Sequence, residues 1–179
     1  MSTFFKFFFF SFCIFLCQLT ASSQVQVGND IDGEAAGDES GYSISMPNEN
    51  TIAIGARKND GNGLNSGHAR VYKRIGNGWV QLGADIDGEF SSDLSGTAVS
   101  MPDSITLGIG APINSGKGHV RVFQWNGNSW VQKGSDIDGE SNSDLSGRAI
   151  SMPDAQTIAI GAEQNDGNGM AAGHVRVFS

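Results

Sequence analysis

Cysteine is nearly absent from this chain of 179 residues. The two cysteines that occur, Cys13 and Cys17, both lie in an apolar N-terminal segment. If that segment is removed, the remaining chain can form no disulfide and must be held by packing alone. No zinc signature, nucleophile motif or phosphate-binding loop is present either. The chain therefore offers no familiar catalytic motif, and we expect it not to be an enzyme.

Basic residues are also scarce. With Lys6 left out, ten basic residues face nineteen acidic ones, which gives a net charge of −9. Nucleic-acid binding depends on lysine and arginine neutralising phosphates, so this balance argues against nucleic acid as a partner. An excess of carboxylates keeps a protein soluble and attracts cations.

Long apolar runs are confined to the N-terminus. Residues 7–16 are almost wholly apolar, they follow Lys6, and small residues occupy 20–23. This pattern predicts a secretory signal peptide over 1–23, removed after Ser23. The run is shorter than the roughly 20 residues that a membrane-spanning helix needs, so no transmembrane segment is expected after signal removal. We expect a protein that is secreted, extracellular or attached to the cell surface.

Helical periodicity is missing, and a threefold repeat stands in its place over 24–179. The sequence Gly-x-Asp-Ile-Asp-Gly-Glu occurs at 28–34, 83–89 and 134–140. Met-Pro, Ile-Gly-Ala and Gly-His follow each copy in the same order. The second copy is shorter in only one place, between Gly-Ala and Gly-His, which indicates a surface loop there. The repeats therefore start near residues 28, 83 and 134.

Each repeat predicts four short antiparallel strands. In the first copy we expect them near 42–46, 51–56, 68–72 and 79–83, separated by turns rich in glycine and asparagine. Four strands per roughly 50 residues, repeated head to tail, are typical of β-propeller blades. The prediction is an all-β chain with three such blades, a partial or oligomer-completed propeller. A stacked solenoid is the alternative.

The repeats resemble the FG-GAP repeats of integrin α-chain propellers and their bacterial relatives. The resemblance rests on Gly41-Tyr42, on 53–56 and 107–112, and on the closing strand at 120–123. It implies a secreted or surface propeller that binds ligands and often carries calcium. The chain departs from the family in three respects. Only the second copy, at 110–112, keeps Gly-Ala-Pro. Serine replaces the phenylalanine before the strand glycine, at Ser40, Ser95 and Ser146, and the Asp-x-Asp-x-Asp-Gly calcium loop is absent.

The acidic linkers that open the repeats are the best candidates for a cation site. Calcium takes six to eight oxygen ligands, and Asp-x-Asp-Gly bends the chain so that carboxylates and carbonyls converge. The alternative is that the aspartates form turns between blades with solvated carboxylates. The candidate calcium ligands are Asp30, Asp32, Glu34, Asp85, Asp87, Glu89, Asp136, Asp138 and Glu140.

The histidines and tryptophans suggest packing more than chemistry. His68, His119 and His174 occupy equivalent positions, so a ring of repeats would keep them apart, and we expect structural roles. Trp79 and Trp130 match in register and are expected to be packing anchors. Trp125 stands outside the repeat beside a turn, and it is the candidate contact for a protein or glycan ligand.

The functional hypothesis is a non-enzymatic module for ligand binding or adhesion, assisted by calcium. A purely structural partial propeller, or a fragment of a longer surface protein, is the first alternative. A glycan-active enzyme is the second.

Residues 24–28 match 79–83, the fourth strand of the first repeat. They therefore predict one more strand of that kind ahead of the first repeat. Since propellers need about four to eight blades to close, we expect two chains to form a homodimeric six-bladed ring.

Overall fold

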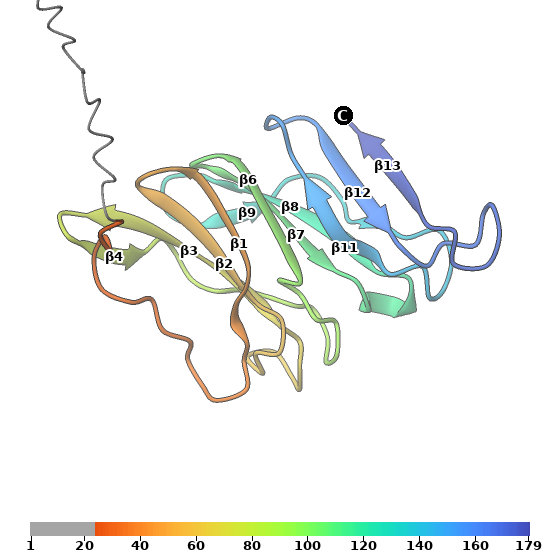
Figure 1. Ribbon diagram of the computed structural model, residues 1–179, viewed down its shortest axis with the longest axis horizontal. Helices are drawn as coiled ribbons and strands as arrows, with labels where there is room; N and C mark the ends of the chain where they lie inside the picture. The colour runs from red at the N-terminus through yellow and green to blue at the C-terminus, as the bar shows by residue number, and fades with distance from the viewer. Residues whose placement is uncertain (1–23) are drawn as a thin grey trace, which may run out of the picture.

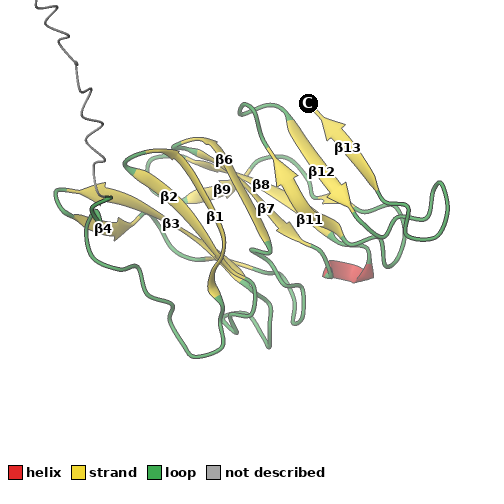
Figure 2. Cartoon of the chain, viewed as in Figure 1, coloured by secondary structure: helices red, strands yellow, loops and turns green. Residues whose placement is uncertain are grey.

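The computed structural model describes residues 24–179, which form an all-β fold (Figures 1 and 2). The signal peptide expected over 1–23 lies outside the described residues. Within 24–179, the sole helical element is one 3-10 turn, η1 (Asn114–Gly116). No helix in this range has the length and hydropathy to span a bilayer.

The first sheet is an antiparallel meander made by the first repeat. Its order is β1 (Ser40–Asn48), β2 (Thr51–Ala56), β3 (His68–Ile75) and β4 (Gly78–Gln81). A fifth, two-residue strand, β5 (Ile86–Asp87), also pairs with β3. This strand comes from the linker of the second repeat, so the second linker is hydrogen-bonded to the first sheet.

The second sheet repeats this plan. It contains β6 (Ala98–Asp103), β7 (Thr106–Ala111), β8 (His119–Trp125) and β9 (Trp130–Gln132). The linker of the third repeat adds β10 (Ile137–Asp138) to β8. The third sheet has three strands, β11 (Ser146–Ser151), β12 (Ile158–Ala162) and β13 (His174–Phe178). All pairings within the three sheets are antiparallel.

The strand boundaries follow from local chemistry. A Ser-Gly pair opens β1 and β11 and stands just before β6, and its glycine has a positive φ, 88° at Gly41, 83° at Gly96 and 87° at Gly147. A side chain would be strained in that conformation, so glycine is required. The register of β1 slips beside this glycine and again near Met-Pro, where proline cannot donate to the ladder.

The three sheets lie side by side, with β1, β6 and β11 forming the line along which they meet (Figure 1). One apolar cluster fills the space between the first two sheets and includes Val71, Val99, Met101 and Leu107. A second cluster lies between the second and third sheets around Val120 and Ile160. Polar contacts join the same faces, because Ser45 Oγ accepts from the Met101 amide and Ser100 Oγ from the Met152 amide.

The prediction of an all-β chain with repeated antiparallel meanders is confirmed. One detail differs, because residues 24–28 form no strand. This segment lies instead against β4, where the Trp79 indole donates to the Val27 carbonyl oxygen at 3.2 Å. The equivalent contact in the next repeat joins Trp130 to Leu82. A strand needs a neighbouring strand to pair with, and among the described residues none is offered to 24–28.

Candidate functional site

The second and third acidic linkers reach the histidines because each pairs with the sheet before it. In the pairing of β5 with β3, Asp87 lies opposite His68 and Ile86 lies opposite Ala69. Ile86 is buried and fixes the linker against the first sheet. In this register the carboxylates of the second linker are brought to the start of β3.

The first cluster gathers side chains from two successive repeats. His68 Nδ1 lies 3.6 Å from Asp85 Oδ2 and 3.8 Å from Glu34 Oε2. Asp87 Oδ1 is slightly farther, at 4.0 Å from the same nitrogen. The histidine and Glu34 belong to the first repeat, and both aspartates belong to the second. The three groups of Glu34, His68 and Asp85 are close enough to share one metal ion.

The second cluster has the same composition one repeat later. His119 Nδ1 lies 3.9 Å from Glu89 Oε2 and 3.7 Å from Asp136 Oδ2. At the third position, His174 Nδ1 lies 3.7 Å from Glu140 Oε2. Within 24–179 no aspartate joins this third pair.

Neighbouring side chains orient the carboxylates. Arg70 Nη1 lies 3.4 Å from Glu34 Oε1, so the other oxygen of Glu34 faces the histidine. The Gln81 side-chain amide donates to Asp85 Oδ1 at 2.6 Å, which leaves Oδ2 to face it as well. The second cluster keeps both contacts, through Arg121 to Glu89 and through Gln132 to Asp136.

Both complete clusters contain a buried imidazole. His68 and His119 are each 1% exposed, and neither Nδ1 has a hydrogen-bond partner among the described residues. Burial lowers the pKa of both histidines below the ordinary 6.5, because desolvation disfavours the charged form. Each imidazole is therefore neutral at pH 7 and can offer a nitrogen lone pair to an ion. Burial also raises the pKa of Asp87, with the charges of Asp85 and Glu34 acting in the same direction.

A separate set of linker aspartates is purely structural. Asp38, Asp93 and Asp144 are buried, and each accepts a hydrogen bond from an asparagine amide at 2.9 Å. Each also accepts from a backbone amide three residues earlier, such as Phe90 N to Asp93 at 2.8 Å. These carboxylates are thus held by hydrogen bonds within the repeat, and they lie outside the histidine clusters.

The nine predicted ligands divide into groups. Glu34, Asp85, Glu89 and Asp136 join the two complete clusters, Asp87 lies at the edge of the first, and Glu140 lies beside His174. Asp30, Asp32 and Asp138 are exposed and lie outside the clusters. Sequence reasoning missed the histidines, because it compared equivalent positions and not one repeat's linker with the previous repeat's strand. One signal was available in the sequence. Each Gly-His is followed by the Asp-Ile-Asp of the next repeat, the segment that pairs with the strand starting at that histidine.

Trp125, the predicted ligand contact, is half-buried. Its ring lies 5.6 Å from that of Trp130, centroid to centroid, and near Gly83. It lines a cavity of about 410 Å³ together with Val131, Gln132 and Lys133.

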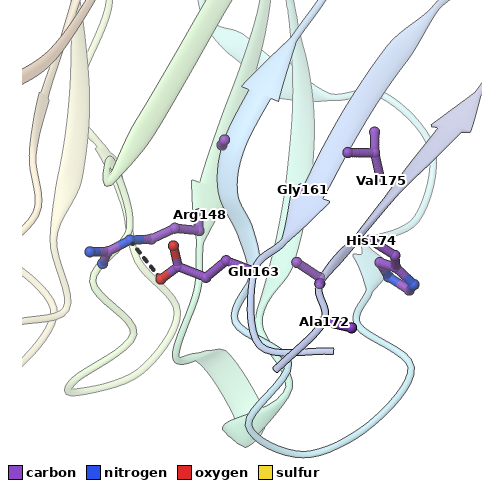
Figure 3. A pocket seen from close by; sticks show the side chains of 9 residues that line it. Arg148, Gly161, Glu163, Ala172, His174 and Val175 are labelled. Atoms are coloured by element: carbon purple, nitrogen blue, oxygen red, sulfur yellow. Dashed lines mark ion pairs between the residues drawn. The ribbon is translucent and has the colours of Figure 1, made fainter. Parts of the chain in front are cut away.

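A larger hollow lies on the third sheet. This cavity of about 460 Å³ is lined by Gly161, Glu163, His174, Val175 and neighbouring residues of the same sheet (Figure 3). Arg148 and Glu163 form an ion pair at one side of it, with 3.4 Å between Nε and Oε1.

The two earlier sheets have no such hollow at this place. A Cβ on Gly55 would collide with the Gly96 carbonyl, and one on Gly110 with the Gly147 carbonyl. A Cβ on Gly161 would meet only Ala149 of its own sheet. In the first two sheets, the Ser-Gly pair of the following repeat occupies the space beside this glycine. In the third sheet the same space is open.

Comparison with known proteins identifies the repeat. Residues 31–72 match the FG-GAP repeat family. The matched segment contains Glu34, the β1–β2 hairpin and the start of β3 with His68. FG-GAP repeats build propeller-type modules that occur in extracellular and surface proteins. No curated protein matched the chain.

Proposed function

We propose that this chain is a secreted or cell-surface, non-enzymatic FG-GAP module that binds a protein or glycan ligand or serves adhesion. The observation that carries the proposal is the FG-GAP match over 31–72 within a row of similar sheets. Repeated sheets with near-identical sites suit recognition over an extended surface. An enzyme would need one copy to differ from the others in its polar residues.

Apolar side chains at the outer face of the first sheet support a ring made by two copies. Ile44 and Met46 are 63% and 50% exposed. Their equivalents in the second sheet, Val99 and Met101, are 8% and 5% exposed because they pack on the first sheet. The face of β1 is therefore built to pack against the sheet of another repeat.

The outer face of the third sheet has the complementary shape. Val175 and Val177 are exposed there, and Val175 lines the cavity above Gly161 (Figure 3). By analogy with the inner junctions, the cavity fits the Ser40–Gly41 backbone of a second copy. Val177 would then pack against Ile44 and Met46. We propose that two chains close a six-sheet ring by making this contact twice, with twofold symmetry.

Two further features belong to this proposal. The acidic linkers are proposed to bind a divalent cation, and calcium is the ion that their carboxylates alone would favour. Trp125 is proposed as a ligand contact, because it borders a cavity that Gln132 and Lys133 also line. A half-buried tryptophan with polar neighbours suits either a sugar ring or a protein side chain.

The full 179-residue chain should be expressed in a secreting host and purified from the medium. We expect an N-terminus near Gln24 and, by light scattering, twice the mass of one mature chain. Tyr42→Glu with Ile44→Glu should give a folded monomer, because charge on this face opposes its burial.

A well-folded wild-type monomer would refute the two-chain ring. In that case the exposed faces are covered by further sheets of a longer protein or remain open in a structural partial propeller. Retention of intact Met1 inside the cell would refute secretion.

A further inference from the structure

The two Glu–His–Asp clusters have the composition of a metal centre. We infer that each binds one divalent transition-metal ion, with Zn²⁺ as the best-fitting ion, at the junction between successive sheets. The first ion would be held by Glu34, His68 and Asp85, and the second by Glu89, His119 and Asp136. Both sites lie within one chain, so the inference does not need the two-chain ring.

The spacing of the ligand atoms suits such an ion. Nitrogen and oxygen ligands at about 2.0–2.2 Å from a tetrahedral zinc ion lie about 3.3–3.5 Å from each other. The nitrogen–oxygen separations in the clusters are 3.6 and 3.8 Å in the first and 3.7 and 3.9 Å in the second. The groups are thus slightly too far apart for direct hydrogen bonds, and small rotations bring them to ligand distance.

The buried imidazoles point to a ligand independently of the carboxylates. A buried nitrogen without a partner costs free energy, and native structures rarely leave one unpaired. Here the same atom, Nδ1, is unpaired in both His68 and His119 among residues 24–179. In each case the two nearest acidic groups surround that atom. An ion between them gives the nitrogen a partner and neutralises the carboxylates.

The donor set selects the class of ion. Imidazole nitrogen and carboxylate oxygen are both zinc ligands, whereas calcium takes six to eight oxygens and imidazole is not among its ligands. Two carboxylates also balance the charge of a divalent ion. Gln81 and Gln132 each hold one oxygen of the ligating aspartate and leave the other toward the histidine. Partners of this kind orient ligands at metal sites.

The third position is half of the same site. His174 and Glu140 lie 3.7 Å apart, and the missing ligand corresponds to Asp30 of the repeat pattern. Gln26 donates to Asp30 Oδ1 at 2.8 Å, as Gln81 does to Asp85. If the proposed ring forms, Asp30 of a second copy completes this site. The ion count would then be three per chain in the ring and two per chain in a monomer.

The test measures zinc retained by the purified mature protein. The protein is stripped with a chelator, loaded with ZnCl₂, passed through a desalting column and analysed for metal and for mass by light scattering. We expect two ions per monomeric chain, or three per chain in a dimer. Millimolar CaCl₂ should not displace them. Loading with Co²⁺ should give the visible absorption of a tetrahedral site.

Matched double variants locate the ions. Asp85→Asn with Asp136→Asn should lose two ions per chain. Asp32→Asn with Asp138→Asn removes the same charge from exposed positions of the first and third linkers, and it should keep every ion. NMR of the wild-type histidines adds a readout that needs no variant, since Zn²⁺ should shift the ring signals of His68 and His119 in the monomer and leave those of His174 unchanged.

Three results would overturn the inference: no zinc retained by the folded protein, equal loss in both double variants, or displacement by calcium. The last result would favour a carboxylate calcium site. Failure of the ring is a separate outcome, because it changes the measured mass and lowers the count from three to two without removing either complete site.

Discussion

The junction between the first and second sheets and the outer face of the third sheet are built from the same sequence pattern. Val71, in β3 at the junction, is 1% exposed, whereas its equivalent Val177, in β13, is 66% exposed. Gly55 touches the backbone of the next repeat, and Gly161 faces a cavity. The residue types are the same, so the difference in burial comes from the presence of a neighbouring sheet.

The comparison shows that each repeat has two unlike docking faces. One is the apolar face of the first strand, and the other is the small-residue face around the strand glycine. The small-residue face of one repeat packs against the first-strand face of the next repeat. Both inner junctions are made in this way. The two outer faces therefore have the same structure as the inner ones and differ only in lacking a neighbouring sheet. Substitutions can test this directly.

The largest expected effect is at the glycine of the second strand of each sheet. Gly110→Ala would place a methyl group against the Gly147 carbonyl across the inner junction, and overpacking there should cost about 3 kcal/mol of unfolding free energy. Gly161→Ala meets only Ala149 of its own sheet, so the same change should alter the stability of a single chain by less than about 1 kcal/mol. Urea unfolding of monomeric protein measures both values.

Gly161→Ala serves a second purpose. In the proposed ring its methyl group would meet Gly41 of the second copy, so the variant should remain folded and become monomeric. Equal losses of stability in Gly110→Ala and Gly161→Ala monomers would show that the two faces are not equivalent in the way described.

A smaller effect is expected at the valines. Val71→Ala removes two buried methyl groups from the apolar cluster between the first two sheets and should lower the unfolding free energy by about 2 kcal/mol. Val177→Ala alters an exposed side chain and should change the unfolding free energy of a monomer by less than about 0.5 kcal/mol. A cost at Val177 that appears only in the dimer would sharpen the comparison, because it would report burial by the second copy.

The smallest effect concerns pH. The folded state holds His68 and His119 neutral, since burial lowers the pKa of each below 6.5. Histidines in the unfolded chain take up protons near pH 6.5, so the unfolded state is favoured as the pH falls through that value. In a chelator, the melting temperature should drop by a few degrees between pH 7.5 and 5.5. His68→Gln with His119→Gln should flatten that slope, and an unchanged slope would contradict the assignment.

Much of the fold could be predicted from the sequence, because local chemistry determines it. Alternation in 42–46 and the glycine-rich turns give strands whose partners are close in the chain. Exposure of Ile44 could not be predicted in this way, since it depends on which sheet lies beside β1.

The acidic residues of the candidate site were predicted as well, but their grouping was not. Glu34 meets Asp85 only because β5 pairs with the sheet of the preceding repeat. That pairing joins positions far apart in the sequence, and a comparison of the copies with one another does not reveal it.

Pairing of each linker with the preceding sheet also places the sequence repeat and the folding unit out of phase. A cut just before Gly83 would separate two complete sequence repeats, yet it would take from the first sheet its fifth strand and the aspartate beside His68. A cut after Glu89 would keep both. Boundaries for truncation, permutation or transplantation of a single sheet therefore belong after the acidic linker, so that each excised sheet keeps the first residues of its successor.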